Sequence, residues 1–132
     1  MTIGTVIMVE SQDETRAMMA DWLEDAGYEV LACPGPGGPD YLCLGGRGLA
    51  CPLAAPADIV VLSMQLRSDY MQQGTPSWIL LAYYVEAGKR VVAITSEPNS
   101  VNPLSDDQCT VLKRPVDRAD LIDALKTPAY IR

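Results

Sequence analysis

The chain alternates short apolar runs with segments whose apolar residues recur at helical spacing. Residues 5–9 form a continuous apolar run, which is typical of a strand buried on both faces. Residues 11–14 (Ser-Gln-Asp-Glu) have the form of a capping box, which predicts a helix with Ser11 as its N-cap. That helix would end at Gly27. Its predicted inward stripe consists of Met18, Trp22 and Ala26, with Met19 and Leu23 beside it.

The same rhythm continues towards the end of the chain. Further strands are predicted at residues 28–32, 59–62, 91–95 and 110–112. A second helix would have Thr75 as N-cap and Pro76 as first residue, carry a stripe of Trp78, Ala82 and Val85, and end at Gly88. A third would be capped by Asp117, turn Leu121, Ile122 and Leu125 inward, and be closed by Pro128. Strands that alternate with helices imply right-handed crossovers and a parallel sheet covered on both faces.

Two stretches interrupt this rhythm. Residues 33–56 hold six of the ten glycines, five of the ten prolines and three of the four cysteines. They stand where a second crossover helix would belong, and their composition predicts that a loop replaces or shortens that helix. Residues 96–107 contain Pro98 and Pro103, so we expect a remodelled region with a short helix or none.

The composition narrows the classes of protein. With 132 residues, 48% of them hydrophobic, the chain fits a single globular domain over residues 1–132. The absence of histidine excludes Ser-His-Asp and Cys-His nucleophiles, His-ligated zinc and phosphohistidine carriers. A net charge of −7 argues against nucleic acid as a partner. No segment has the form of a signal peptide or a membrane span, so we expect a cytoplasmic protein with reduced cysteines and no membrane partner.

Polar side chains stand where the predicted strands end. Glu10 and Ser11 follow the first strand, Ser63 the third, Thr95 ends the fourth, and Arg114 follows the fifth. Ligands of open parallel sheets bind outside the carboxyl ends of the strands. These five side chains are therefore expected to converge on one crevice.

At this point the chain resembles the receiver domain of two-component response regulators, of the chemotaxis-regulator type. The resemblance is carried by residues 6–16, 57–64, 91–95 and 112–117. It implies a flavodoxin-like, three-layer α/β/α fold with five parallel strands in the order 2-1-3-4-5. It also implies signal transduction through protein partners such as a sensor kinase or a downstream effector. A homodimer is left open.

The resemblance also implies a chemistry. Receivers of this family are phosphorylated on a carboxylate at the end of the third strand, beside Mg²⁺ held by paired acids after the first. Glu10 matches the first acid, but Ser11 stands at the second and Ser63 at the phosphoacceptor position. Thr95 matches the hydroxyl on the fourth strand, and Arg114, before a proline, matches a lysine. We therefore expect a degenerate pocket, with no Mg²⁺ or other cofactor and no enzymatic activity, in a module that acts by protein–protein interaction.

Several alternatives stay open for this crevice. Shifting the alignment by one residue would give the place of Arg114 to Lys113. Arg114 could serve only as an ion-pair partner of Glu10. A phosphoryl group could also be accepted elsewhere, at Asp58 or Asp69.

The cysteines suggest a different function, in redox or metal sensing. Cys33, Cys43 and Cys51 are candidate ligands, with Cys109 as a fourth, although they lack the close pairs usual in structural zinc sites. A redox pair between Cys43 and Cys51 is the other form of this hypothesis. Reduced thiols packed against apolar neighbours are the plainer interpretation.

Overall fold

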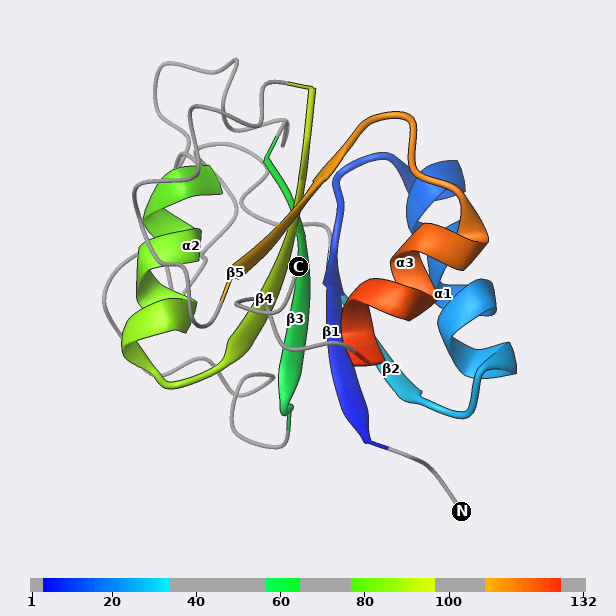
Figure 1. Cartoon of the computed structure of the whole chain (residues 1–132), viewed down its shortest axis with the longest axis horizontal. Coiled ribbons are helices and arrows are strands. Elements are labelled where there is room, and N and C mark those ends of the chain that lie inside the picture. Colours follow the sequence, from blue (N-terminus) through cyan, green and yellow to red (C-terminus); the bar gives the residue numbers. More distant parts are fainter. Residues whose placement is uncertain (1–3, 34–56, 65–76, 97–108, 127–132) are drawn as a thin grey trace.

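Five strands form one parallel sheet in the computed structural model, which describes residues 4–33, 57–64, 77–96 and 109–126. The strands are β1 (Thr5–Val9), β2 (Glu29–Cys33), β3 (Ile59–Ser63), β4 (Arg90–Thr95) and β5 (Cys109–Lys113). Their order is β2-β1-β3-β4-β5, and every pairing is parallel (Figure 1). The predicted strand order is confirmed. The strands form because β-branched and apolar residues suit positions covered on both faces of a sheet.

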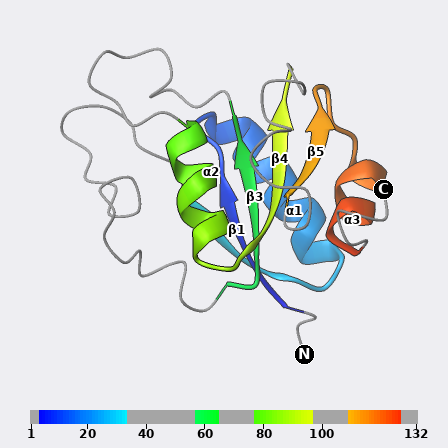
Figure 2. The same ribbon diagram turned by 60° about the vertical axis from the view of Figure 1, so that its left-hand side comes forward.

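Helices cover both faces of this sheet. Helices α1 (Asp13–Asp25) and α3 (Arg118–Lys126) lie on one face, and α2 (Ser77–Glu86) lies on the other (Figures 1 and 2). The arrangement is the predicted three-layer α/β/α sandwich. Since all strands run the same way, their carboxyl ends meet at one edge of the sheet.

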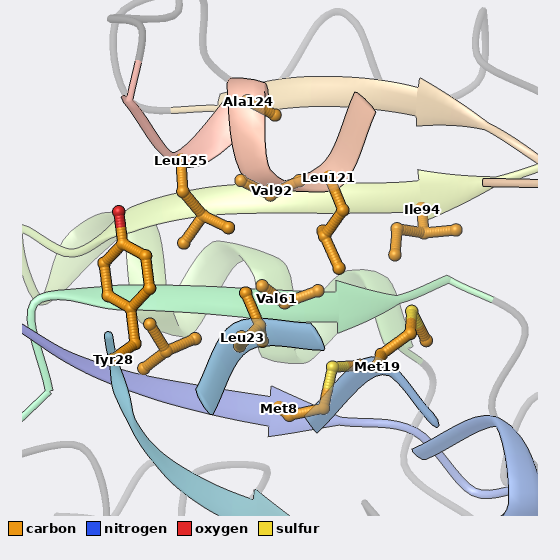
Figure 3. Packing of buried hydrophobic residues seen from close by; sticks show 11 residues of the cluster. Met8, Met19, Leu23, Tyr28, Val61, Val92, Ile94, Leu121, Ala124 and Leu125 are labelled. Carbon is orange, nitrogen blue, oxygen red and sulfur yellow. The ribbon is translucent and has the colours of Figure 1, made fainter. Parts of the chain in front are cut away.

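The core consists of two apolar clusters separated by the sheet. Alternate residues of each strand point to opposite faces, so Val6 and Met8 join one cluster while Ile7 and Val9 join the other. The cluster under α1 and α3 includes Leu23 (Figure 3). The cluster under α2 includes Leu81 and Tyr84. A shift of strand register by one residue would move the side chains of one cluster to the face of the other.

The first helix differs from the prediction in two respects. Its N-cap is Gln12 rather than Ser11, and the backbone N–H of Gln12 donates to a carboxylate oxygen of Glu10 at 3.3 Å. Its most deeply buried face also lies one residue further along, while Trp22 and Ala26 of the predicted stripe pack against the core as partly buried residues. Leu23 is fully buried, whereas Met18, placed in the predicted stripe, is 44% exposed. The reason is that two neighbouring apolar stripes are available on this helix, and packing against the sheet selects one of them.

Helices α2 and α3 can also be compared with their predicted stripes and caps. In the part of α2 whose side chains the structure describes, residues 81–86, Leu81 and Tyr84 are buried, while Ala82, from the predicted stripe, is half-buried. Trp78 of that stripe lies outside this part. In α3 the predicted N-cap is confirmed, because Asp117 Oδ1 accepts the backbone N–H of Asp120 at 2.8 Å. Gly88 adopts φ of 80°, which explains why a glycine follows α2.

Several predictions fall outside the described residues. They are the loop expected to replace the second crossover helix, the remodelled segment beyond Ser96, the caps Thr75 and Pro76, and the closing Pro128. Among the described residues, no helix has the length and apolar character needed to cross a membrane.

Candidate functional site

Glu10 is a buried acid directly beyond β1, with only 1% of its surface exposed. Its backbone N–H donates to the carbonyl of Cys33 at 3.0 Å, which extends the pairing of β1 with β2 by one residue. Its own carbonyl accepts a hydrogen bond from Arg16 Nη1 at 2.8 Å. The backbone at Glu10 is thus held from both sides, and the carboxylate has a defined position.

Ser63 and Thr95 occupy equivalent places on neighbouring strands. Ser63 is the last residue of β3 and is 0% exposed, and Thr95 is the last residue of β4 and is 1% exposed. Directly after Ser63, the backbone N–H of Met64 donates to the carbonyl of Ile94 in β4 at 2.8 Å. Both hydroxyl side chains therefore stand at the carboxyl edge of the sheet, shielded from solvent.

Arg114 joins this edge from the turn that follows β5. Its backbone N–H donates to the carbonyl of Thr95 at 3.0 Å. Its Nη2 lies 3.3 Å from Glu10 Oε1, and the same nitrogen donates to the hydroxyl oxygen of Ser63. The guanidinium side chain is 30% exposed, whereas the Glu10 side chain is 2% exposed. One arginine thus bridges the ends of β1 and β3, with its charge open to solvent on one side.

The structure therefore brings the predicted crevice residues to one edge of the sheet. Ser11 follows Glu10 and is half-buried. The alternative alignment through Lys113 does not match the geometry, because Lys113 is exposed while Arg114 reaches the buried acid. The sequence interpretation missed the contact of Arg16 with the Glu10 carbonyl. Its position one turn into a helix after the acid was the available signal.

Among the described residues, the acid and the cysteines proposed as alternatives do not come together as a site. Asp58 is exposed and stands at the amino end of β3, away from the crevice, and Asp69 lies outside the described residues. Cys33 ends β2 and Cys109 begins β5, and these are the two opposite edge strands. The two cysteines therefore cannot share a metal ion. The described part of the chain contains no cluster of three His, Cys, Asp or Glu residues that could hold one. Cys43 and Cys51 lie outside it.

Burial changes the chemistry of Cys109. The pKa of its thiol is raised to about 11 by desolvation, which a hydrogen bond with the backbone of Ala93 partly offsets. The thiolate is the form that binds metals and attacks disulfides. At neutral pH Cys109 is therefore a neutral, apolar core residue, as the plainer interpretation of the cysteines expects.

Several solved structures share this architecture. A response regulator receiver protein from Sinorhizobium medicae superposes with a TM-score of 0.67 at 17% identity, over 93% of this chain and 91% of that one. The Vibrio cholerae chemotaxis protein CheY4 gives a TM-score of 0.68 at 16% identity, over 95% and 98%. The receiver domain of the hybrid histidine kinase CckA gives 0.63 at 22% identity, over 93% and 96%. The chain has the receiver fold. No protein-family model and no curated protein sequence matches it.

The crevice of this receiver fold does not fit Mg²⁺. That ion requires near-octahedral oxygen ligands, among which carboxylates usually anchor it. The buried carboxylate at this edge is Glu10, and its two oxygens accept hydrogen bonds from Arg114 and from the backbone of Gln12. The described residues form no cluster of three acids that could hold a metal ion. The hydroxyl of Ser63 also accepts from Arg114, whose positive charge opposes a second cation. The donor set suits a guanidinium group rather than a metal ion.

Proposed function

We propose that the chain is a receiver-like signalling module that binds a protein partner and does not accept a phosphoryl group. The observation that carries this proposal is Ser63, a fully buried hydroxyl that receives a hydrogen bond from Arg114 at the end of β3. The resemblance places the acceptor carboxylate of the family at this position. A serine there cannot form an acyl phosphate.

The described surroundings of Ser63 argue against attack of its hydroxyl on a phosphoryl donor. A serine nucleophile needs an adjacent general base. The chain contains no histidine, and the Glu10 carboxylate is paired with Arg114. A positive charge beside the hydroxyl assists loss of its proton, but the part of the crevice that the structure describes offers no unpaired base to take the proton. The module is therefore proposed to be non-enzymatic and phosphorylation-independent.

A protein partner is the output that suits a receiver fold with this crevice. The structural neighbours include a chemotaxis protein and the receiver domain of a hybrid histidine kinase. On this likeness we propose a sensor kinase or a downstream effector as partner, in the cytoplasm. The net charge of −7 disfavours nucleic acid. A homodimer stays a prediction, as does a role for residues 99–107 in partner contact, since that segment lies outside the described residues.

Phosphorylation is tested directly with acetyl phosphate and Mg²⁺, followed by intact mass spectrometry. A phosphorylatable receiver treated in parallel is the positive control. We expect the wild type and a Ser63→Ala variant to remain unmodified. A gain of one phosphoryl group by the wild type would contradict the proposal, and its mapping to Asp58 or Asp69 would establish the alternative acceptor.

A gain-of-function arm tests how far the crevice has diverged. Ser11→Asp with Ser63→Asp restores carboxylates at both positions, and a third change, Arg114→Lys, replaces the bridging guanidinium with a smaller cation. Mg²⁺ binding and phosphorylation are measured for the double and triple variants. We expect the triple variant to respond more strongly, because Arg114 pairs with the acids in the double variant.

Partner binding is tested separately. An affinity-tagged wild-type protein is compared with a variant altered between Asn99 and Asp107, with and without acetyl phosphate. We expect one specific partner, recovered equally in both conditions and lost from the variant. Recovery that depends on acetyl phosphate, or no specific partner at all, would argue against the proposal.

A further inference from the structure

We infer that the guanidinium group of Arg114 is the resident cation of this crevice and holds its carboxyl edge in one constant arrangement. The inference deepens the proposed function, on which it rests for the claim that the crevice needs no phosphoryl group. It assigns to a side chain of the protein itself the charge balance that a bound metal ion would otherwise provide. The regulatory consequence is a crevice that does not respond to divalent cations.

The first argument is the burial of Glu10. A carboxylate with 1% of its surface exposed is costly to keep charged unless an opposite charge or hydrogen-bond donors compensate it. The described residues supply both, through Arg114 Nη2 at 3.3 Å and the backbone N–H of Gln12 at 3.3 Å. Arg114 is the member of this set that carries a full positive charge.

The second argument is that both partners are anchored by the backbone. Glu10 is tied to β2 through the carbonyl of Cys33, and Arg114 is tied to β4 through the carbonyl of Thr95, each at 3.0 Å. The ion pair therefore joins two backbone positions that the sheet already holds. Its formation orders mainly the Arg114 side chain, because Glu10 is already buried, whereas a pair on the surface must order two mobile side chains.

The third argument is the contact with Ser63. The Nη2 atom that faces Glu10 also donates to the Ser63 hydroxyl, so one nitrogen spans the ends of β1 and β3. A carboxylate at residue 63 would add a second negative charge to this crevice, which one guanidinium would not fully neutralise. Ser63 and Arg114 are thus matched to each other, because a neutral acceptor accompanies a cation that is paired with Glu10.

Urea and thermal unfolding of four proteins test the inference: the wild type, Arg114→Met, Glu10→Gln, and the double variant. Arg118→Met is the matched control, since Arg118 is exposed and its ion pair with Asp25 has a separation of 3.9 Å. We expect Arg114→Met to lower the melting temperature by about 5–10 °C, because it leaves Glu10 buried without its cation. Adding Glu10→Gln to that variant should recover part of the loss, while Arg118→Met should change little.

Magnesium provides the second measurement, with 10 mM MgCl₂ compared against KCl of matched ionic strength. We expect Mg²⁺ to leave the wild type unchanged and to raise the melting temperature of Arg114→Met by about 2–3 °C, the shift for a site with Kd about 5 mM. The Glu10→Gln/Arg114→Met protein, in which neither charge remains, should not respond.

The outcomes separate this inference from the proposed function. The inference would be overturned if Mg²⁺ raised the melting temperatures of the wild type and Arg114→Met equally. It would also be overturned if Arg114→Met and Arg118→Met lowered the melting temperature equally. If Arg114→Met does not fold, Arg114→Lys and the Glu10→Gln/Arg114→Met protein test the inference instead. Both should fold, because neither leaves the buried Glu10 carboxylate without a cation. A negative result in these unfolding measurements leaves the acetyl phosphate test of the proposed function unaffected. If the wild type were phosphorylated instead, the comparison of unfolding among the four proteins could still be interpreted.

Discussion

Replacement of Arg90 by methionine is expected to destabilise the protein from a position far from the crevice. Arg90 is the first residue of β4, and its guanidinium donates to the carbonyls of Leu125 at 2.9 Å and Ala124 at 2.8 Å. These carbonyls belong to the last turn of α3, where the helix has no backbone donors of its own. The arginine therefore ties the end of α3 to the start of β4.

The size of the effect follows from what the substitution removes. Two hydrogen bonds from a charged donor and a favourable interaction with the helix C-terminus are lost, while methionine keeps most of the apolar packing. We expect the free energy of unfolding to fall by about 2–3 kcal/mol. Arg90→Lys, which keeps the charge but offers a different geometry, should lose about half as much.

Urea unfolding followed by tryptophan fluorescence measures this change, because Trp22 of α1 packs against the same cluster as α3. Arg118→Met, an exposed arginine on α3 itself, is the control and should change the free energy by less than about 0.5 kcal/mol. If Arg90→Met costs no more than Arg118→Met, the two hydrogen bonds do not hold α3 in solution and the reasoning fails.

Three further predictions concern the core. Leu23→Ala should lower the free energy of unfolding by about 2–5 kcal/mol, whereas Met18→Ala, on the exposed side of α1, should change it by under about 1 kcal/mol in the same urea titration. Thr110→Val should raise stability by about 1 kcal/mol, since the buried Thr110 hydroxyl has no hydrogen-bond partner in the described structure; a loss would indicate a missed partner. The raised pKa of Cys109, about 11 against an ordinary 9.0, favours the neutral thiol in the folded state. The corresponding stability is present below pH 9 and lost between about pH 9 and 11, so Cys109→Ala should flatten that decline in thermal melts.

Much of the fold could be predicted because the signals are local. Continuous apolar runs marked the strands, and the strand–helix alternation with right-handed crossovers left few topologies for a parallel sheet. The phase of the helices could not be predicted in the same way. On α1 both the Met18 stripe and the Met19–Leu23 stripe are apolar, and only packing against Met8 and Val61 selects the second.

The crevice, too, could be predicted from the sequence only in part. Which residues stand at the carboxyl edge follows from where each strand ends, so Glu10, Ser63, Thr95 and Arg114 could be placed together from the sequence. Their contacts depend on distances between strands that are remote in the chain. The separation of 104 positions between Glu10 and Arg114 carries no local signal, and the choice between Arg114 and Lys113 rests on which side chain the turn after β5 directs inward. A buried charge needs its partner in three dimensions, and that requirement becomes visible only once the sheet is assembled.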